Sequence, residues 1–276
     1  MKRLFLTLLI PFLNFTAWGQ NTDSLAVIQQ DWSEQRVKKG IVWKQAHFED
    51  LFGGKQAVNL IEIDLKRQHK KLKLAGVSQG MKLTSDFARE NRAAVAVNGG
   101  FFNTKIGGAV DFIKIDGTVI NVSSNKHPRS NAYLVFDKKS VKIIPRTQDS
   151  IRDRSADNVL LSGPLLLSDS EFAALDDSKF NDNKHPRTAV ALRGNTLIFI
   201  TIDGRNAMSH GVSLPELSKF LKWYGCEDAM NLDGGGSTTM YVKGQPDNGV
   251  VNYPSDNKKF DHQGERPVAN ILYIRD

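Results

Sequence analysis

The sequence of 276 residues contains very little cysteine, and this scarcity excludes several kinds of protein. Cys226 is its single cysteine, so the chain forms no intramolecular disulfide and no zinc ribbon. The neighbouring residues Tyr224, Gly225 and Ala229 predict a small, packed side chain near a helix end. A nucleophilic thiol is the alternative, but an isolated free cysteine is usually a buried apolar residue.

Several functional patterns are also missing. No long basic run with interleaved aromatic residues occurs, which argues against a nucleic-acid partner. The net charge of +7 falls to +5 without the two basic residues of the N-terminal segment, Lys2 and Arg3, a mild charge that suits an anionic substrate without specifying one. The glycines at 234–236 are not followed by Lys-Ser or Lys-Thr and lead into a predicted strand, which excludes a nucleotide P-loop. Neither His-x-His nor His-Glu-x-x-His spacing is present, and no fixed-period repeat is found.

The sequence has no long apolar run, only a short one near the N-terminus. Residues 4–15 are apolar but interrupted by Pro11 and Asn14, which makes the run too short for a membrane span. It follows Lys2 and Arg3 and precedes Ala17-Trp18-Gly19, a pattern typical of a secretory signal. We therefore expect a signal peptide over residues 1–19, cleavage between Gly19 and Gln20, and an exported protein, periplasmic or secreted, without a membrane span. A retained interfacial anchor is the alternative, and the oligomeric state is not predicted.

The rest of the chain is long enough for one large domain. Residues 20–42 space Leu25, Ile28, Trp32 and Val37 as a short amphipathic helix would, and indicate a lead-in helix or linker. Helices are also predicted over 85–92, with Ser85 as a possible N-cap, and over 213–224, where Ser213 and Glu216 have the spacing of a capping box. Strands are predicted over residues 57–65, 93–97, 112–115, 118–122, 132–136, 141–144, 159–167, 188–192, 197–202 and 229–232.

Hairpin signals and helix-to-strand passages occur together along this chain. The predicted fold is therefore α+β, with twisted mixed β-sheets packed with a few helices in a single domain over residues 43–276.

The segment from Asn231 to Met240 has the most unusual composition. Asp233 is followed by Gly234, Gly235 and Gly236 and then by three hydroxyl side chains, with apolar residues on both sides. A glycine-rich turn lets a ligand approach the main chain and points N–H groups at an anion. A merely flexible turn is the alternative, but it does not explain the adjoining carboxylate and hydroxyls. We therefore predict a ligand-binding turn with Asp233 at a strand end.

Four further segments combine glycine or proline with polar side chains beside predicted strands. Taken singly, Asp203 is a turn residue, His185 a loop residue and Arg187 an edge charge. In order along the chain, the five segments are Asn98-Gly99-Gly100-Phe101-Phe102, Pro186-Arg187-Thr188-Ala189, Asp203-Gly204-Arg205, Asn231–Ser237 and Arg266-Pro267-Val268-Ala269-Asn270. Together they resemble the phosphodiester glycosidase domain, over roughly residues 55–276.

The resemblance implies cleavage of a sugar-1-phosphodiester at the anomeric carbon–oxygen bond. No cofactor is expected, with a divalent cation as the alternative. Such a reaction passes through an oxocarbenium-like transition state. Its phosphate leaving group needs charge stabilisation by arginines and backbone N–H groups more than it needs protonation. Asp233 is the predicted nucleophile or general base, and Asp203 is the predicted second carboxylate. The predicted substrate- or phosphate-binding residues are Asn98, Gly99, Gly100, Arg187, Thr188, Arg205, Gly234, Gly235, Gly236, Ser237, Thr238 and Arg266.

Other assignments stay open from the sequence. The second carboxylate has further candidates, namely Asp111, Asp116, Glu227, Asp228 and Glu265. A different enzyme, a metal-dependent phosphodiesterase, would hold a divalent cation with Asp203, Asp233 and Asp111 and with His185 or His210. A non-catalytic module that binds anionic envelope glycans would use the same arginines and glycines. In each case the expected partner is a phosphorylated glycan or sugar-1-phosphodiester.

Overall fold

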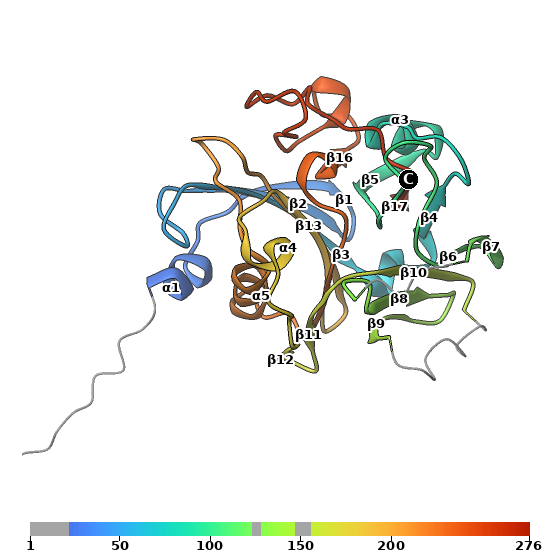
Figure 1. The fold of residues 1–276 in the computed structure, drawn as a ribbon, viewed down its shortest axis with the longest axis horizontal. Coiled ribbons are helices and arrows are strands. Elements are labelled where there is room, and N and C mark those ends of the chain that lie inside the picture. Colours follow the sequence, from blue (N-terminus) through green and yellow to red (C-terminus); the bar gives the residue numbers. More distant parts are fainter. Residues whose placement is uncertain (1–21, 123–127, 147–155) are drawn as a thin grey trace, which may run out of the picture.

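The computed structural model describes residues 22–122, 128–146 and 156–276, and its strands form three sheets (Figure 1). The predicted signal peptide and its cleavage site lie outside the described residues. Within the described part of the chain, no helix combines the length and the apolarity that crossing a bilayer requires.

The largest sheet has eight strands and separates two cores. Alternate residues of its strands face opposite sides, so Phe199 faces one core and Ile200 the other. Helices α1 (Thr22–Ile28) and α5 (Leu214–Trp223) cover the second side, as Figure 1 shows. The strands, in spatial order, are β1 (Ser33–Lys38), β2 (Ile41–Phe48), β3 (Gln56–Asp64), β14 (Thr196–Ile202), β13 (Arg187–Arg193), β15 (Asp228–Asn231), β11 (Leu165–Ser168) and β12 (Glu171–Phe172).

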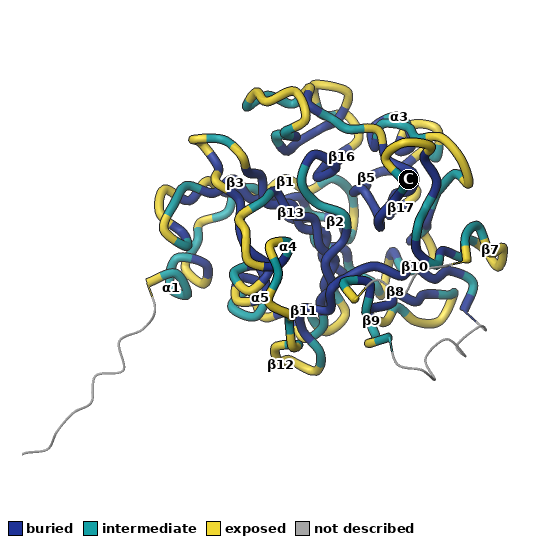
Figure 2. The backbone as a smooth tube through the Cα atoms, in the orientation of Figure 1, coloured by how far each residue is buried: buried dark blue, intermediate teal, exposed yellow. Residues whose placement is uncertain are grey.

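The two smaller sheets pack against the first side. The four-stranded sheet is β16 (Met240–Val242), β5 (Ala93–Asn98), β17 (Asn270–Arg275) and β4 (Leu72–Gly76), with α3 (Thr84–Glu90) on its outer face. The five-stranded sheet is β7 (Thr118–Asn121), β6 (Ile113–Ile115), β10 (Asn158–Ser162), β8 (Ala132–Phe136) and β9 (Val141–Pro145). Val97, Leu134 and Phe199 belong to one buried cluster, so the three sheets share a core, and Figure 2 shows their strands buried where they meet.

The α+β class is confirmed, with differences in detail. Every ladder between the described strands is antiparallel, whereas the sequence indicated mixed sheets. The lead-in helix covers only Thr22–Ile28, and the strands β1 and β2 follow it directly. The apolar run 159–167 is two strands, β10 and β11, which belong to different sheets. The remaining short helices are α2 (Leu65–Gln68), α4 (Lys179–Asp182), η1 (His69–Lys71), η3 (Gly235–Ser237) and η4 (Asp247–Gly249).

Helix starts show where local sequence was sufficient and where it was not. The predicted capping box of α5 is confirmed, because the Ser213 hydroxyl accepts from Glu216 N and the Glu216 carboxylate accepts from Ser213 N. The N-cap of α3 is Leu83, not Ser85. Instead, Ser85 donates through both N and Oγ to Glu265, at 3.0 and 2.6 Å. A carboxylate distant in sequence thus replaces a local cap.

Cys226 has the buried, packed position that the sequence predicted. Its side chain lies in the core beneath α5. Burial raises the pKa of the Cys226 thiol to about 12, so the thiol stays protonated at neutral pH. A protonated, buried thiol is a poor nucleophile, and the packing role follows.

Candidate functional site

Three adjacent strands bring the predicted carboxylates and Arg187 to one end of the eight-stranded sheet. Arg187 opens β13 and pairs with Ile202, the residue before Asp203 on β14. On the other side of β13, Leu232 N donates to Thr188 O at 2.8 Å, which places Asp233 at the same end. Segments that are separate in the sequence are therefore neighbours in the sheet.

Asn98, at the end of β5, ties this end of the large sheet to the four-stranded sheet. Its Nδ2 donates to Asp233 O at 2.6 Å. Its Oδ1 accepts from Thr188 Oγ1 at 2.8 Å and from Thr239 N at 3.1 Å. Asn98 and Thr188 are fully buried, so their side chains position the Asp233 turn.

Gly99 is required by close packing against Asn270, to which the neighbouring Gly100 is hydrogen-bonded. Gly100 N donates to Asn270 Oδ1 at 2.7 Å, and Asp233 N donates to Gly99 O at 3.0 Å. A Cβ on Gly99 would lie 2.2 Å from Asn270 Oδ1, too close for any other residue. The Asn-Gly-Gly segment is therefore a backbone support for Asp233.

Asp233 is partly exposed and is the carboxylate that a ligand can reach. Burial raises its pKa to about 6, although the Ser237 hydroxyl, the charges of Arg129 and Arg266 and the Gly234 N–H act in the opposite direction. At neutral pH the carboxylate is thus ionised but holds a proton at mildly acidic pH. A group poised near the working pH suits proton transfer.

Asp203 lies close by in a different environment. It is fully buried, its Oδ1 accepts from Asn252 Nδ2 at 2.7 Å, and its Oδ2 has no hydrogen-bond partner among the described residues. Burial raises the pKa of Asp203 to about 7, opposed by Asn252 and by the Tyr253 N–H. The same Asn252 Nδ2 donates to Thr238 O at 3.1 Å, so one amide connects Asp203 to the residues after the glycines.

Arg187 is largely occupied by protein carbonyls. Only 2% of it is exposed. Its Nε donates to Val212 O at 3.0 Å, and its Nη2 donates to Phe180 O at 2.7 Å and to Asn183 O at 2.9 Å. Burial, and then the nearby charge of Arg205, lower its pKa to about 10. Its contacts fasten the 180–183 segment against β13.

Arg205 and Arg266 lie over the glycine turn, close to two of its three glycines. A Cβ on Gly235 would lie 3.0 Å from Arg205 Nη2, and a Cβ on Gly236 would lie 2.5 Å from Arg266 Nη2. Arg205 is exposed and has φ +62°, an uncommon backbone conformation for a residue with a side chain. Arg266 pairs with Asp256, whose Oδ1 accepts from Nη2 at 2.5 Å and from Nε at 3.1 Å.

Several N–H groups of the turn donate to carbonyls of the protein. Gly235 has φ +63° and its N donates to Pro186 O at 2.8 Å, while Ser237 N and Thr238 N donate to Gly234 O and Gly235 O at 3.2 Å. The Thr238 hydroxyl is buried without a partner among the described residues. The turn is thus held in shape by its own backbone bonds.

The other carboxylate candidates do not meet Asp233. Asp228 pairs with Leu192 at the opposite end of β13, and Glu227 accepts there from Gly194 N. Asp116 pairs with Lys73, and Glu265 caps α3. Asp111 accepts from Ser130 Oγ at 2.6 Å. Within the described part of the chain, no three His, Cys, Asp or Glu side chains are grouped closely enough to hold a metal ion.

Two residues of the site escaped the sequence analysis. Asn252 lies outside the five segments, and its importance arises from contacts with Asp203, Thr238 and Met240. Arg129 precedes β8 in a stretch without any motif, yet its charge acts on Asp233. No local sequence signal distinguishes either of them.

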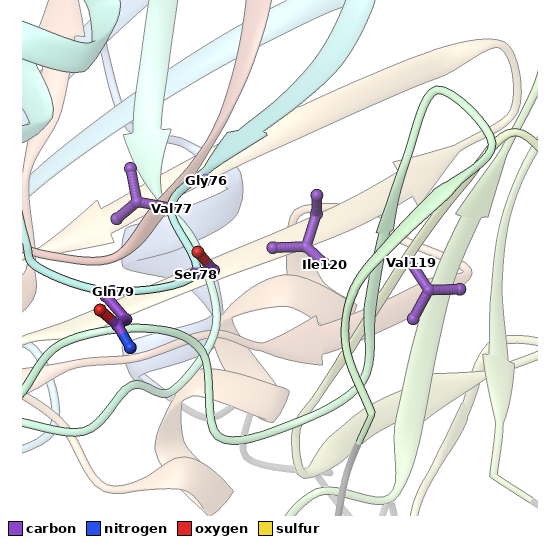
Figure 3. A pocket seen from close by; sticks show the side chains of 6 residues that line it. All are labelled: Gly76, Val77, Ser78, Gln79, Val119 and Ile120. Atoms are coloured by element: carbon purple, nitrogen blue, oxygen red, sulfur yellow. The ribbon is translucent and has the colours of Figure 1, made fainter.

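A groove of about 490 Å³ lies beside the site, between the end of β4 and the hairpin strand β7. In Figure 3, Val77, Ser78 and Gln79 line one wall, and Val119 and Ile120 line the other. Gly76 at its edge is in register with Asn270, so the β17 strand separates the groove from Gly99. Its lining has no charged side chain, and the groove is distinct from the arginine-lined turn.

The model of a known family, the phosphodiester glycosidase, matches residues 91–275 of this chain. The chain belongs to the phosphodiester glycosidase family. All five segments of the candidate site fall inside this phosphodiester glycosidase match.

Curated relatives share part of the sequence. The chain is 27% identical over 212 residues to the SPbeta prophage-derived protein YomE of Bacillus subtilis, covering 68% of this chain and 33% of that protein. It is 27% identical over 184 residues to the bovine N-acetylglucosamine-1-phosphodiester alpha-N-acetylglucosaminidase, covering 61% of this chain and 34% of the enzyme. The chain therefore spans about a third of the length of these relatives.

Solved structures show the same fold. The catalytic domain of zebrafish N-acetylglucosamine-1-phosphodiester alpha-N-acetylglucosaminidase, auto-inhibited by its pro-peptide, matches with a TM-score of 0.70 at 22% identity. That match covers 90% of this chain and 87% of the zebrafish chain. A hypothetical protein from Synechocystis matches with a TM-score of 0.68 at 16% identity, over 89% of this chain and 64% of that one. At these identities the likeness establishes the phosphodiester glycosidase fold.

Proposed function

We propose that this protein is a hydrolase that cleaves a sugar-1-phosphodiester at the glycosidic carbon–oxygen bond, in envelope or scavenged glycans. The observation that carries the proposal is Asp233, a reachable carboxylate with a raised pKa, in a glycine turn overlaid by Arg205 and Arg266. Membership of the phosphodiester glycosidase family supports a glycosidase-type reaction. The enzymes named among its relatives act on a sugar phosphodiester.

In this proposal the arginines hold the phosphate and Asp233 acts at the sugar. Phosphate leaves as a stable anion, so charge stabilisation by Arg205 and Arg266 contributes more than protonation does. Asp233, ionised above about pH 6, is the nucleophile or the general base. The oxocarbenium-like transition state is positive at the anomeric carbon and is favoured by that negative charge.

Asp203 is proposed as the second carboxylate. With a pKa of about 7, it holds a proton in the same range in which Asp233 has lost one, and two carboxyl groups with separated pKa values can divide acid and base roles. Activity is then expected to rise through about pH 6 and to fall above about pH 7. Asn98, Thr188, Arg187, Gly99 and Gly100 act as the support of this pair.

The remaining predicted residues belong to the anion-binding turn in this proposal. The backbone of Gly234, Gly235 and Gly236 leaves space for the arginines and for the phosphate. Ser237 lies against Asp233 and lowers its pKa, and the unpartnered Thr238 hydroxyl is available to a buried ligand group. Because the three glycines carry no side chains, the phosphate can approach the main chain closely.

The test is hydrolysis of a panel of sugar 1-phosphodiesters in oxygen-18 water, followed by NMR. Oxygen-18 in the sugar product means glycosidic cleavage and supports the proposal. Oxygen-18 in the phosphate means a phosphodiesterase, and activity that is lost with a chelator would mark it as metal-dependent. Bound but uncleaved sugar phosphate would indicate a binding module, and either result overturns the proposal.

Export is proposed separately. The charged, apolar and small-residue pattern of residues 1–19 supports a signal peptide. Mass spectrometry of the protein recovered from its native cells and medium tests this proposal. A mature N-terminus at Gln20 in the periplasmic or secreted fraction is expected, whereas an intact N-terminus in the cytosol contradicts it.

A further inference from the structure

Arg129 is an arginine of the site that no motif marks, and its backbone is firmly held. The next residue, Ser130, donates its hydroxyl to Asp111 at 2.6 Å and accepts from Arg146 Nη1 at 3.1 Å through its carbonyl. Asn131 accepts from Leu165 N at 2.7 Å. The starting point of the Arg129 side chain is therefore fixed by contacts with three other segments.

Two aromatic rings hold the guanidinium. Arg129 Cζ lies 4.3 Å from the ring centre of Phe101 and 5.2 Å from that of Phe180. The two rings are 6.0 Å apart in an edge-to-face arrangement. Ring faces attract a cation and restrict its orientation without neutralising its charge. Phe101 belongs to the Asn-Gly-Gly-Phe-Phe segment, so this aromatic clamp of Phe101 and Phe180 gives that segment a role beyond backbone support.

The charge of Arg129 lacks the partners that Arg187 and Arg266 have. Its Nε is buried without a hydrogen-bond partner, and no carboxylate pairs with it, within the described residues. By contrast, Arg187 donates to three carbonyls and Arg266 pairs with Asp256. A buried polar nitrogen without a partner is costly, and a ligand acceptor removes that cost.

The position of Arg129 relative to Asp233 indicates what that ligand is. Its charge acts on the Asp233 carboxylate although the two form no direct ion pair. A guanidinium presents a planar fork of N–H donors that matches phosphate oxygens. We propose that Arg129, held by the Phe101 and Phe180 rings, contacts the phosphate group of the ligand beside Asp233.

The phosphate identity rests on the proposed function, but contact with an anion can be tested without any hydrolysis. The probe is inorganic phosphate, titrated into the full chain by calorimetry. Arg129→Met is expected to raise the dissociation constant by roughly 10- to 100-fold, the loss of a charge-assisted hydrogen bond. Arg67→Met, which removes the same charge from an exposed pair with Asp64, is the matched control and is expected to bind like the wild type.

Two more variants separate charge from placement. Arg129→Lys keeps the charge but loses the planar fork and is expected to bind phosphate with intermediate affinity. Phe180→Leu keeps Arg129 but removes one ring of the clamp, and should weaken binding about two- to fivefold. If Arg129→Met fails to fold, as judged by thermal unfolding, Arg129→Lys decides by the same measurement.

A second readout excludes a merely structural effect. The pKa of Asp233, followed by carbon-13 NMR of its carboxyl group, should rise in Arg129→Met because one charge that lowers it is gone, and should not change in Arg67→Met. Unchanged phosphate affinity in both Arg129 variants, or no phosphate binding by the wild type, overturns the proposal. If the wild type binds phosphate through Arg129 but cleaves no phosphodiester, the reaction assigned above is wrong and the anion contact stands.

Discussion

The two ends of the large sheet differ in how their carboxylates are paired. At one end, Glu62 accepts from Arg193 Nη2 at 2.6 Å and from Tyr224 OH at 2.7 Å, with Lys44 at 3.5 Å. Burial acts to raise the pKa of Glu62, but the Tyr224 hydrogen bond and the charges of Arg193 and Lys44 hold it below its usual value. At the other end, Asp203 has one oxygen without a partner and a pKa of about 7.

One end of these strands therefore carries a carboxylate that stabilises the fold, and the other end carries one that is a candidate for chemistry. A carboxylate surrounded by donors stays ionised and stabilises the fold. Where a carboxylate is buried with few donors, its ionised form is destabilised. Proteins keep such unsatisfied groups mainly at functional sites. Variants at the two ends can show whether this contrast holds.

The largest expected effect is on catalysis at the Asp233 end. Asp233→Asn removes the proposed nucleophile or base and should reduce turnover roughly 10³-fold or more, with no loss of thermal stability, because burial disfavours the ionised form of the wild-type carboxyl. The control is Asp228→Asn, at the opposite end of β15, which should retain wild-type turnover. Wild-type rates in Asp233→Asn would end the assignment.

The next effect concerns the pH dependence of stability. The pKa of Asp203 is higher in the folded chain than the 3.8 of the unfolded chain, so its contribution to stability is full below about pH 4 and is lost as the pH rises through about 7. The difference corresponds to on the order of 4 kcal/mol. Asp203→Asn should therefore be more stable than the wild type at pH 8 by up to that amount, with the gap closing toward pH 4, measured by urea unfolding.

A carboxylate with the opposite shift provides the comparison for Asp203. Burial acts to raise the pKa of Asp116, but the hydrogen bond and charge of Lys73 bring it below its usual value. Its contribution to stability is thus present at neutral pH and is lost in acid. Asp116→Asn should lower stability at pH 8, opposite in sign to Asp203→Asn. Equal behaviour of the two variants would show that the Asp203 carboxylate is not destabilised by burial.

Arg205 should show a trade between activity and stability. Its φ of +62° is unfavourable for a residue with a side chain, so Arg205→Gly should gain about 1 kcal/mol of unfolding free energy while losing about 10- to 100-fold in activity. Ser170→Gly, at φ +65° in the β11–β12 turn, should gain stability without loss of activity. A fully active Arg205→Gly would remove Arg205 from the phosphate site.

The smallest effect on activity is expected at the paired end. Glu62→Gln removes the negative charge that Arg193, Lys44 and Tyr224 contact. It should lower the unfolding free energy by about 2 kcal/mol. Turnover and its pH profile should not change, because these residues lie away from Asp233. A shifted pH profile would show that the two ends of the sheet are electrostatically coupled.

Local patterns in the sequence were sufficient for part of this structure. The capping box at Ser213, the hairpins and each of the five segments could be recognised because each consists of residues close together in the chain. Asn252 and Arg129 could not, because an asparagine or arginine in a loop has no distinguishing neighbours and acquires its role from distant contacts. The sequence also could not show that Arg187 donates to backbone carbonyls, since the folded 180–183 segment and Val212 supply them.

The strand β17 has a consequence for how the protein reaches its working state. It lies between β5 and β4, and Asn270 at its start receives the N–H of Gly100. Asn252 and Arg266 also come late in the chain. A polypeptide is synthesised from its N-terminus, so Asn98 and Thr188 are present before Asp233, whereas Asn252, Arg266 and Asn270 are added after it. The proposed site is therefore complete only after β17 has paired with β5 and β4.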